Sequence, residues 1–383
     1  MNVMNQTVKE GYSLYHGDSV EVLKDIPSDS IHYTLFSPPF ASLYTYSNSD
    51  RDMGNCKTDQ EFFTQFGYLV RELYRITMPG RLLSFHCMNI PMMKSRDGAI
   101  GLKDFRGDLI RVFAEAGFIY HSEVVIWKNP VTEMQRTKAL GLLHKQIRKD
   151  SSMSRQGIPD YIVTMRKPGD NPEPIPHDHQ NFPVNMWQKY ASPVWMDIRQ
   201  SNTLNRKAAR EEKDEKHIAP LQLDVIDRCI KLWTNPGDIV LDPFLGIGST
   251  VVEAIRLHRR GIGIELKGSY YDQAVLNCEQ AEKDAPSVTD FDVVTDDTIT
   301  EEETAEAQAP AEDTPAPAED TPAPAQAEET AVYNIPADEN SANSTTVTDG
   351  QSMSTVSVTN EGIDLAVEKS KESSWLDDLL GGL

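Results

Sequence analysis

Short apolar runs alternate with amphipathic helix patterns between residues 31 and 281, and this alternation constrains the fold more than any other feature. The pattern over 59–80, for example, repeats apolar residues at helical spacing and closes with a Pro-Gly pair that is expected to end the helix. Such alternation is typical of a mostly parallel sheet with helices on both faces. We therefore expect an α/β fold with a doubly wound, mostly parallel sheet. The expected strands are 31–37, 81–88, 121–128, 238–244 and 260–266, and the expected helices are 59–80, 104–117, 223–234, 249–258 and 269–281.

The negative charge of the chain is concentrated at its carboxyl end. Residues 281–383 contain 25 acidic and 3 basic side chains, which account for the whole formal charge of −22. The range 285–383 is also rich in Ala, Pro and Thr, and the heptapeptide AEDTPAP occurs twice in succession at 311–324. A segment of this composition buries too little apolar surface to offset its chain entropy. We therefore expect a disordered acidic tail over 285–383.

The last residues, SSWLDDLLGGL, differ from the rest of this tail. Their apolar side chains can line one side of a short helix, which predicts either a docking peptide for a protein partner or merely an apolar end. These side chains are Trp375, Leu376, Leu379 and Leu380.

Several classes of protein are disfavoured by simple counts. The four cysteines contain no CxxC pair, which argues against a disulfide framework or a zinc site and fits a reducing cytoplasm. The amino terminus has no apolar core of a signal peptide, and no apolar run approaches the roughly 20 residues that cross a bilayer. His177 and His179 lie in a loop without other ligands, so we expect no metal site.

Ligands of doubly wound sheets bind beyond the carboxyl ends of the strands, and a glycine-rich motif falls at that place. In DPFLGIGST a strand ends at Asp242, a turn contains Gly246 and Gly248, and a helix follows. Glycines allow a close approach of the backbone to a ligand, and Glu265 at the end of the next strand suits two ribose hydroxyls. Val251 replaces the third glycine of GxGxxG, so a nucleoside that carries a carboxylate fits better than a dinucleotide.

A second motif, Ser37-Pro38-Pro39-Phe40, follows the strand expected over 31–37. The proline rings stiffen the turn and fix the directions of its carbonyl groups. The Ser37 side chain and the Pro38 carbonyl can accept both hydrogens of an exocyclic amine on a nucleobase, and Phe40 can stack on the base. A base within a duplex must be flipped out to reach such a site.

Taken in order, these motifs resemble the S-adenosylmethionine-dependent DNA amino-methyltransferases of the permuted (beta-type) class, in which the catalytic motif precedes the cofactor motif. The similar segments are 15–40, 117–130, 216–250 and 261–274, and the resemblance covers roughly residues 10–282. It implies a Rossmann-like methyltransferase fold, S-adenosyl-L-methionine as cofactor, double-stranded DNA as substrate, and a bacterial or phage-infected cytoplasm as location. It also extends, more weakly, to methyltransferases encoded by bacteriophages.

The resemblance assigns roles residue by residue. It implies that Ser37, Pro38, Pro39 and Phe40 bind the amine, that Asp18 contacts the adenine of the cofactor, and that Glu265 binds its ribose. The methionine end is assigned to Asp242, Phe244, Gly246, Gly248, Ser249 and Thr250, with His217 and Leu221 flanking the cofactor. Two positions depart from the family pattern: Phe36 stands where cytosine-N4 enzymes usually have Thr, and the loop has Ser249-Thr250 instead of two threonines.

A basic stretch lies between the catalytic and the cofactor motifs. Residues 136–167 carry a local charge of +6 where the family keeps its target-recognition region. We expect phosphate contacts from Arg136, Lys138, Lys145, Arg148, Lys149 and Arg155. The expected domains are 1–127 (catalytic half), 128–216 (inserted target-recognition subdomain), 217–284 (cofactor-binding half) and 285–383 (tail).

Three functions compete on this basis. The leading hypothesis is a DNA methyltransferase that modifies an exocyclic amine, with cytosine N4 ahead of adenine N6 because the tetrapeptide begins with Ser. A nicotinamide-dependent dehydrogenase is disfavoured by the missing third glycine and by the Ser-Pro-Pro-Phe turn. A non-catalytic DNA-binding or decoy protein is disfavoured by the intact cofactor loop.

Overall fold

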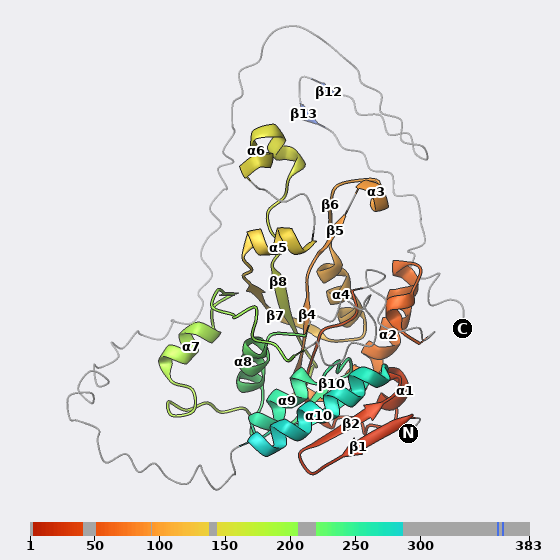
Figure 1. The fold of residues 1–383 in the computed structure, drawn as a ribbon, viewed down its shortest axis with the longest axis vertical. Helices are drawn as coiled ribbons and strands as arrows, with labels where there is room; N and C mark the ends of the chain where they lie inside the picture. The colour runs from red at the N-terminus through yellow and green to blue at the C-terminus, as the bar shows by residue number, and fades with distance from the viewer. Residues whose placement is uncertain are drawn as a thin grey trace, which may run out of the picture. The chain divides into compact units, whose positions relative to one another are not determined.

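The computed structural model describes residues 3–40, 51–92, 94–137, 144–205 and 220–285, and two short strands near the carboxyl terminus. The chain divides into two units, residues 1–296 and 297–383, and Figure 1 shows their elements. In the second unit, β12 (Val358–Thr359) pairs antiparallel with β13 (Gly362–Ile363). The rest of the expected tail, including its Trp-Leu segment, lies outside the described residues.

Nine strands of the first unit form one sheet. Five adjacent strands, β2, β11, β10, β3 and β4, are parallel to their neighbours within this group, while β1 and β8 join it antiparallel. The expected mostly parallel α/β fold is therefore confirmed. In sheet order the strands are β1 (Asn5–Val8), β2 (Tyr12–His16), β11 (Arg260–Glu265), β10 (Ile239–Asp242), β3 (Ile31–Phe36), β4 (Thr77–Cys87), β8 (Asp160–Arg166), β7 (Ile119–Ile126) and β9 (Val194–Trp195).

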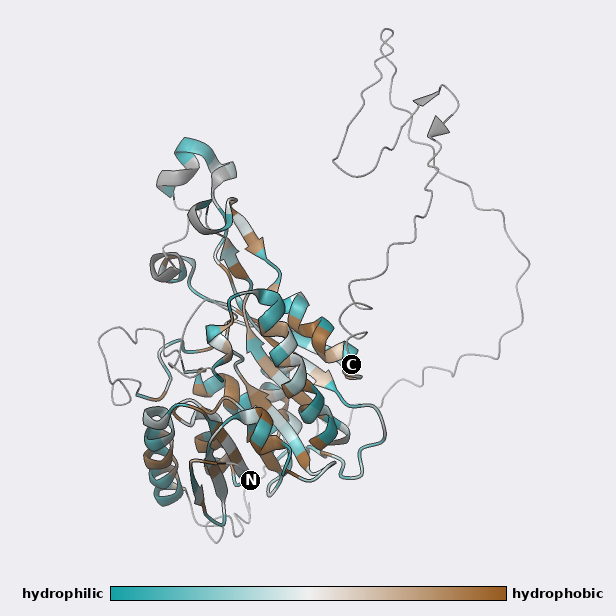
Figure 2. Ribbon diagram, turned by 90° about the vertical axis from the view of Figure 1, so that its right-hand side faces the viewer, coloured by the Kyte–Doolittle hydropathy of each residue, from teal (hydrophilic) through white to brown (hydrophobic). Residues whose placement is uncertain are grey.

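Helices cover both faces of the sheet. The apolar sides of α1, α2 and α4 meet one face in a core that includes Phe66, Phe85 and Phe113. The opposite face is covered by α8, α9 and α10, and Figure 2 shows apolar residues gathered between these layers. The helices are α1 (Ser19–Leu23), α2 (Asp59–Ile76), α4 (Phe105–Glu115), α8 (Leu223–Trp233), α9 (Ser249–Arg256) and α10 (Gly268–Asp284). No helix in the described ranges is both long and apolar enough to cross a membrane.

The end of α2 differs from the expectation. The helix stops at Ile76 rather than at the Pro-Gly pair, and β4 begins at Thr77 and contains Pro79 and Gly80. The Thr77 hydroxyl donates to the Leu73 carbonyl over 2.6 Å, which closes the helix before the Pro-Gly pair is reached. Gly80 then adopts a φ of 72°, a left-handed conformation that glycine tolerates at the start of a strand.

The range 128–216 shares two strands with the central sheet. β8 inserts between β4 and β7, and β9 pairs with β7 at the edge. Because β7 ends and β8 begins at the carboxyl edge of the parallel strands, their connection over 127–159 emerges at that edge. It contains α5 (Pro130–Thr137), α6 (His144–Asp150) and η3 (Ser151–Met153), and Figure 1 shows α5 and α6 beyond the ends of these strands.

The remaining elements are short. A hairpin of β5 (Ile90–Met92) and β6 (Gly101–Lys103), with α3 (Lys94–Asp97) between its strands, follows β4. The 3-10 turn η2 (Met53–Asn55) precedes α2, and α7 (Val184–Tyr190) precedes β9.

Candidate active site

The two sequence motifs follow adjacent parallel strands. Val240 of β10 lies beside Tyr33 of β3, and Leu241 lies beside Thr34. Ser-Pro-Pro-Phe and the glycine loop therefore begin at the same edge of the sheet, where ligands of such sheets bind. Two contacts join the segments: the Phe36 and Phe244 rings lie 5.7 Å apart, and the Thr250 hydroxyl lies 3.4 Å from the Leu35 carbonyl oxygen.

The glycine loop turns tightly into α9. Gly246 and Gly248 have φ values of 55° and 95°, which other residues rarely adopt. Gly248 is the N-cap of α9, and a β-carbon at this position would lie 3.3 Å from that of Ala274. The loop thus forms a close-packed cradle at a helix amino terminus, where backbone N–H groups are available to a ligand.

Two carboxylates support this loop. The Asp242 carboxylate accepts the Phe244 N–H over 3.0 Å, and the Glu265 carboxylate accepts the N–H groups of Gly246 over 2.7 Å and Lys267 over 2.8 Å. Burial raises the pKa of Asp242 to about 7, although hydrogen bonds from Thr250 and from the Phe244 backbone favour the ionised form. Burial likewise raises the pKa of Glu265 to about 7 against its two backbone hydrogen bonds. Since a carboxylate offers about four lone-pair sites, about two remain at Glu265 for a ligand.

The tetrapeptide is packed from both sides. Pro38 and Pro39 are buried, and Ser37 and Phe40 are partly buried. The Phe40 ring lies 6.0 Å from the Phe105 ring and meets the His86 ring edge-on at 6.5 Å. The turn is therefore held in one position, as the two prolines predict.

A row of polar side chains continues from Ser37 across the sheet. The Ser37 hydroxyl lies 2.9 Å from Nδ1 of His86, and Nε2 of His86 lies 3.3 Å from the Asp160 carboxylate. The Lys128 ammonium donates to the other Asp160 oxygen over 2.6 Å. None of the last three residues was among the expected site residues. The signal that could have found His86 is its position near the end of a strand next to the one that carries Ser37.

Of the other expected cofactor residues, the structure describes Asp18 and Leu221. Asp18 is the N-cap of α1 and accepts the Glu21 N–H over 3.1 Å, while the adjoining Gly17 N–H donates to the Glu265 carbonyl over 2.9 Å. Asp18 thus lies beside the end of β11 but has a structural role of its own. Leu221 is buried in the core beneath α8, and His217 lies outside the described residues.

The expected DNA-binding residues belong to the connection between β7 and β8. Arg136 is in α5, Lys145, Arg148 and Lys149 are in α6, and Lys138 lies outside the described residues. Arg148 and Lys149 are exposed. Arg155 instead lies 3.8 Å from the buried carboxylate of Glu133 and donates to the Gln156 carbonyl over 2.8 Å. The connection therefore presents exposed cations from α6 at the edge that carries both motifs.

A cluster with metal-ligand chemistry lies at the opposite edge. Ligand atoms of His32, Glu173 and Asp238 lie within 4.8 Å of one another, near the amino ends of β3 and β10. The Asp238 carboxylate is also ion-paired with the buried guanidinium of Arg81. This cation already balances the Asp238 charge, and we assign no metal to the cluster.

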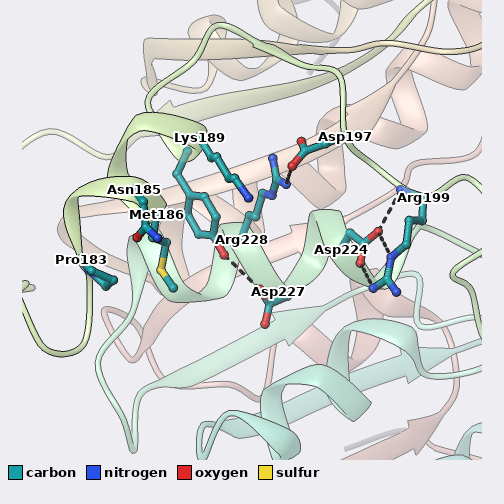
Figure 3. A pocket seen from close by; sticks show the side chains of 10 residues that line it. Pro183, Asn185, Met186, Lys189, Asp197, Arg199, Asp224, Asp227 and Arg228 are labelled. Atoms are coloured by element: carbon teal, nitrogen blue, oxygen red, sulfur yellow. Dashed lines mark hydrogen bonds and ion pairs between the residues drawn. The ribbon is translucent and has the colours of Figure 1, made fainter.

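A hollow of about 450 Å³ lies between α7 and α8 (Figure 3). Four of its charged side chains form two ion pairs: Arg228 with Asp197 over 2.7 Å, and Arg199 with Asp224 over 2.5 Å. Because four of its charged side chains are paired within the protein, we assign the hollow no function.

Comparison with protein families gives one extensive match. The family model N6_N4_Mtase, described as a DNA methylase, matches residues 31–276. The chain is 23% identical over 265 residues to the type II methyltransferase M.BglII of Bacillus subtilis, with 68% of this chain and 67% of that protein covered. It is 24% identical over 300 residues to the DNA adenine methyltransferase YhdJ of Escherichia coli K12, with 71% and 84% covered.

Solved structures share the fold. The cytosine-N4-specific PvuII DNA methyltransferase has a TM-score of 0.52 at 19% identity, with 80% of this chain and 94% of that chain covered. The Thermus thermophilus protein TTHA0409, solved with S-adenosyl-L-methionine, has a TM-score of 0.52 at 22% identity, with 70% and 95% covered. Since the family match spans well over half of the chain, the resemblance seen in the motifs is confirmed, and this protein belongs to the N6/N4 DNA methylase family.

Proposed function

We propose that this protein transfers a methyl group from S-adenosyl-L-methionine to the exocyclic amine of a flipped base in double-stranded DNA, and that the base is cytosine, modified at N4. The observation that carries the proposal is the pairing of β3 with β10, which starts the amine-binding tetrapeptide and the glycine loop at one edge of the sheet. Family membership supports the reaction class.

The residues at the glycine loop fit the proposed cofactor. Gly248 packs against Ala274 of α10, whereas a β-carbon at Gly246 would meet only the Phe244 carbonyl oxygen at 4.0 Å, so the backbone at Gly246 is open to a ligand. Glu265 keeps lone pairs for two ribose hydroxyls after it accepts its two backbone N–H groups. We assign the methionine end to the loop that follows Asp242, and the adenine side to the neighbourhood of Asp18.

The tetrapeptide positions the amine. When bound, S-adenosyl-L-methionine supplies a methyl group on a positively charged sulfur, which the amine nitrogen takes as the carbon–sulfur bond breaks. The Ser37 hydroxyl and the Pro38 carbonyl accept the two amine hydrogens, so that the nitrogen lone pair is drawn out of the base ring and directed away from them. Phe40, held by Phe105, stacks on the base. Because the methyl donor is already reactive, orientation of the amine accounts for most of the catalysis.

The target base is tested directly. The protein is incubated with duplex DNA and labelled S-adenosyl-L-methionine, and the digested DNA is analysed by mass spectrometry. N4-methylcytosine in the digest supports the proposal. N6-methyladenine instead selects the second candidate, an adenine-N6 methyltransferase. If the protein binds DNA but no label enters the DNA, the non-catalytic DNA-binding alternative is selected. The adenine candidate is favoured by Phe36, which replaces the Thr usual before Ser in cytosine-N4 enzymes, and by the similarity to an adenine methyltransferase.

We expect α6 to contact the DNA backbone. Replacing Arg148 and Lys149 together by alanine should weaken binding to any duplex about equally and lower the slope of log affinity against log salt by about 2. The measurement is fluorescence anisotropy over a range of salt concentrations. The control replaces Lys24, at the end of α1, and Lys283, in the last turn of α10. An unchanged salt slope for the α6 variant, or the same change for the control, would contradict the assignment.

Cofactor affinity should depend on pH through Glu265. The ionised carboxylate accepts ribose hydroxyls, and burial raises its pKa to about 7 in the free protein. Above pH 7 the Glu265 carboxylate is mostly ionised and can accept the ribose hydroxyls. Below pH 7 each pH unit lowers the ionised fraction of this carboxylate up to tenfold. The dissociation constant of S-adenosyl-L-methionine should therefore be about tenfold higher at pH 6 than at pH 8, by isothermal titration calorimetry. A constant value over this range would exclude an ionised Glu265 from the binding site.

A further inference from the structure

The pairing of the strands brings together the polar row of Ser37, His86, Asp160 and Lys128. Phe36 of β3 pairs with Phe85 of β4, so the next residues, Ser37 and His86, are cross-strand neighbours. β4 then pairs with β8, which begins at Asp160, and Lys128 follows the end of β7. The row thus takes one side chain from each of four neighbouring segments, all at the carboxyl edge.

Two members of this row are buried charges. The side chains of Asp160 and Lys128 are 7% and 6% exposed, and their ion pair measures 2.6 Å. Burial would raise the pKa of Asp160, but the charges and hydrogen bonds of His86 and Lys128 outweigh this effect and hold the pKa well below its usual value. Asp160 is therefore a fixed negative charge beside the imidazole. Buried groups with perturbed pKa values next to a candidate site are candidates for functional residues.

The fixed charge selects one form of the neutral imidazole. At the 3.3 Å that separate Nε2 from the Asp160 carboxylate, a hydrogen on Nε2 is attracted to the negative charge, whereas a lone pair there would be repelled. With the hydrogen on Nε2, Nδ1 carries a lone pair and can only accept a hydrogen bond. The Ser37 hydroxyl, 2.9 Å away, must then donate to Nδ1, which leaves the lone pairs of its oxygen free for an amine hydrogen.

We propose that His86 is the positioning residue of the amine-binding tetrapeptide, and that it receives, through Ser37, the proton that the amine loses. The proposal rests on the proposed function. As the amine nitrogen gains a methyl group, one of its hydrogens passes to the Ser37 oxygen while the Ser37 hydroxyl hydrogen passes to Nδ1 of His86. The imidazolium that forms lies beside Asp160, and no other reactant is needed. Among the described residues, Asp160 is the charged group that contacts His86, and Lys128 acts on His86 through its ion pair with Asp160.

Two variants separate positioning from proton transfer. In His86→Asn the amide oxygen can still accept the Ser37 hydroxyl but cannot take up a proton, whereas His86→Ala removes both functions. We expect single-turnover methyl transfer to fall about 10²-fold in His86→Ala and less in His86→Asn, with dissociation constants for cofactor and DNA within about twofold of the original protein. The pH profile of the single-turnover rate is the readout specific to proton uptake, and it should differ between the original protein and His86→Asn.

The matched control is His121→Asn. His121 is an exposed residue of β7 whose Nδ1 also lies 2.9 Å from a serine hydroxyl, that of Ser122, so the same chemical change is made away from the row. It should change neither the rate nor its pH dependence. An unchanged pH profile in His86→Asn, or a loss of rate that only parallels a loss of cofactor affinity, would overturn the proposal.

A measurement without turnover tests the hydrogen bonds alone. Nitrogen NMR of the ¹⁵N-labelled original protein should show the hydrogen of the His86 imidazole on Nε2. In Ser37→Ala the Nδ1 resonance of His86 should shift. In Asp160→Asn the imidazole should be a mixture of the form with hydrogen on Nε2 and the form with hydrogen on Nδ1. Hydrogen on Nδ1 in the original protein would overturn the inference. If the protein methylates no DNA at all, the proposed function fails, and these spectra still decide whether the row is arranged as described.

Discussion

Replacing Ser37 by alanine is expected to slow methyl transfer about 10²- to 10³-fold, the range found when one positioned hydrogen-bonding group is removed from an active site. The hydroxyl lies between His86 and the position assigned to the amine, so its loss removes the amine contact and interrupts the polar row together. The glycine loop is held by Glu265 and Asp242 and does not depend on Ser37. The dissociation constant of S-adenosyl-L-methionine should therefore change less than about twofold. Single-turnover kinetics and calorimetry measure the two quantities separately.

The control for Ser37 lies close to the same strand. Ser30 is next to the amino end of β3, and its hydroxyl donates to the Pro27 carbonyl over 2.7 Å. Ser30→Ala removes an equivalent hydroxyl at the opposite edge and should leave the rate unchanged. If Ser37→Ala lowered cofactor affinity as much as it lowered the rate, the tetrapeptide would have a structural role and the assignment of the amine would be wrong.

Elements that are coded locally could be predicted from the sequence. The strand before Ser37 and the strand before Asp242 are each marked by an apolar run followed by an unusual turn, and both are present as β3 and β10. Placing the two turns side by side required only the rule that parallel strands share a carboxyl edge. The helix over 59–80 was also predicted, but its end was not, because the Thr77 hydroxyl rather than the Pro-Gly pair closes it.

Elements that depend on distant pairing could not be predicted. β8 contains the apolar run Tyr161-Ile162-Val163, but the prolines and cations of the surrounding range favoured an inserted subdomain. The place of β8 between β4 and β7 is set by partners far away in the chain. The polar row was missed for the same reason, since Ser37, His86, Asp160 and Lys128 become neighbours only through the sheet register. Asp18 illustrates a different difficulty. Its position matches a family motif, and its side chain also caps α1, so the sequence alone does not separate the two roles.

Glu265→Gln is expected to have the largest effect on cofactor binding. The substitution preserves size but leaves one oxygen where the carboxylate has two, so the Gly246 and Lys267 N–H groups cannot both be accepted as they are now. Hydrogen bonds to a charged group contribute about 1.5–3 kcal/mol each, so losing one such bond to the ribose and weakening the loop should raise the dissociation constant about 10²-fold. Calorimetry measures this change, and the variant should also lose the pH dependence of affinity.

The rate at saturating cofactor distinguishes the role of Glu265 from that of Ser37. The Glu265 carboxylate bonds to the loop that follows β10, whereas Ser37 bonds to His86, so the variant should approach the original rate once enough S-adenosyl-L-methionine is supplied. Asp272→Asn, a change of an exposed carboxylate on α10, is the control and should alter neither quantity. A variant of Glu265 that binds the cofactor normally but transfers the methyl group slowly would place this carboxylate at the amine instead. The proposed function requires that the amine is bound at the end of β3 and the cofactor at the loop after β10, and such a result would contradict this division.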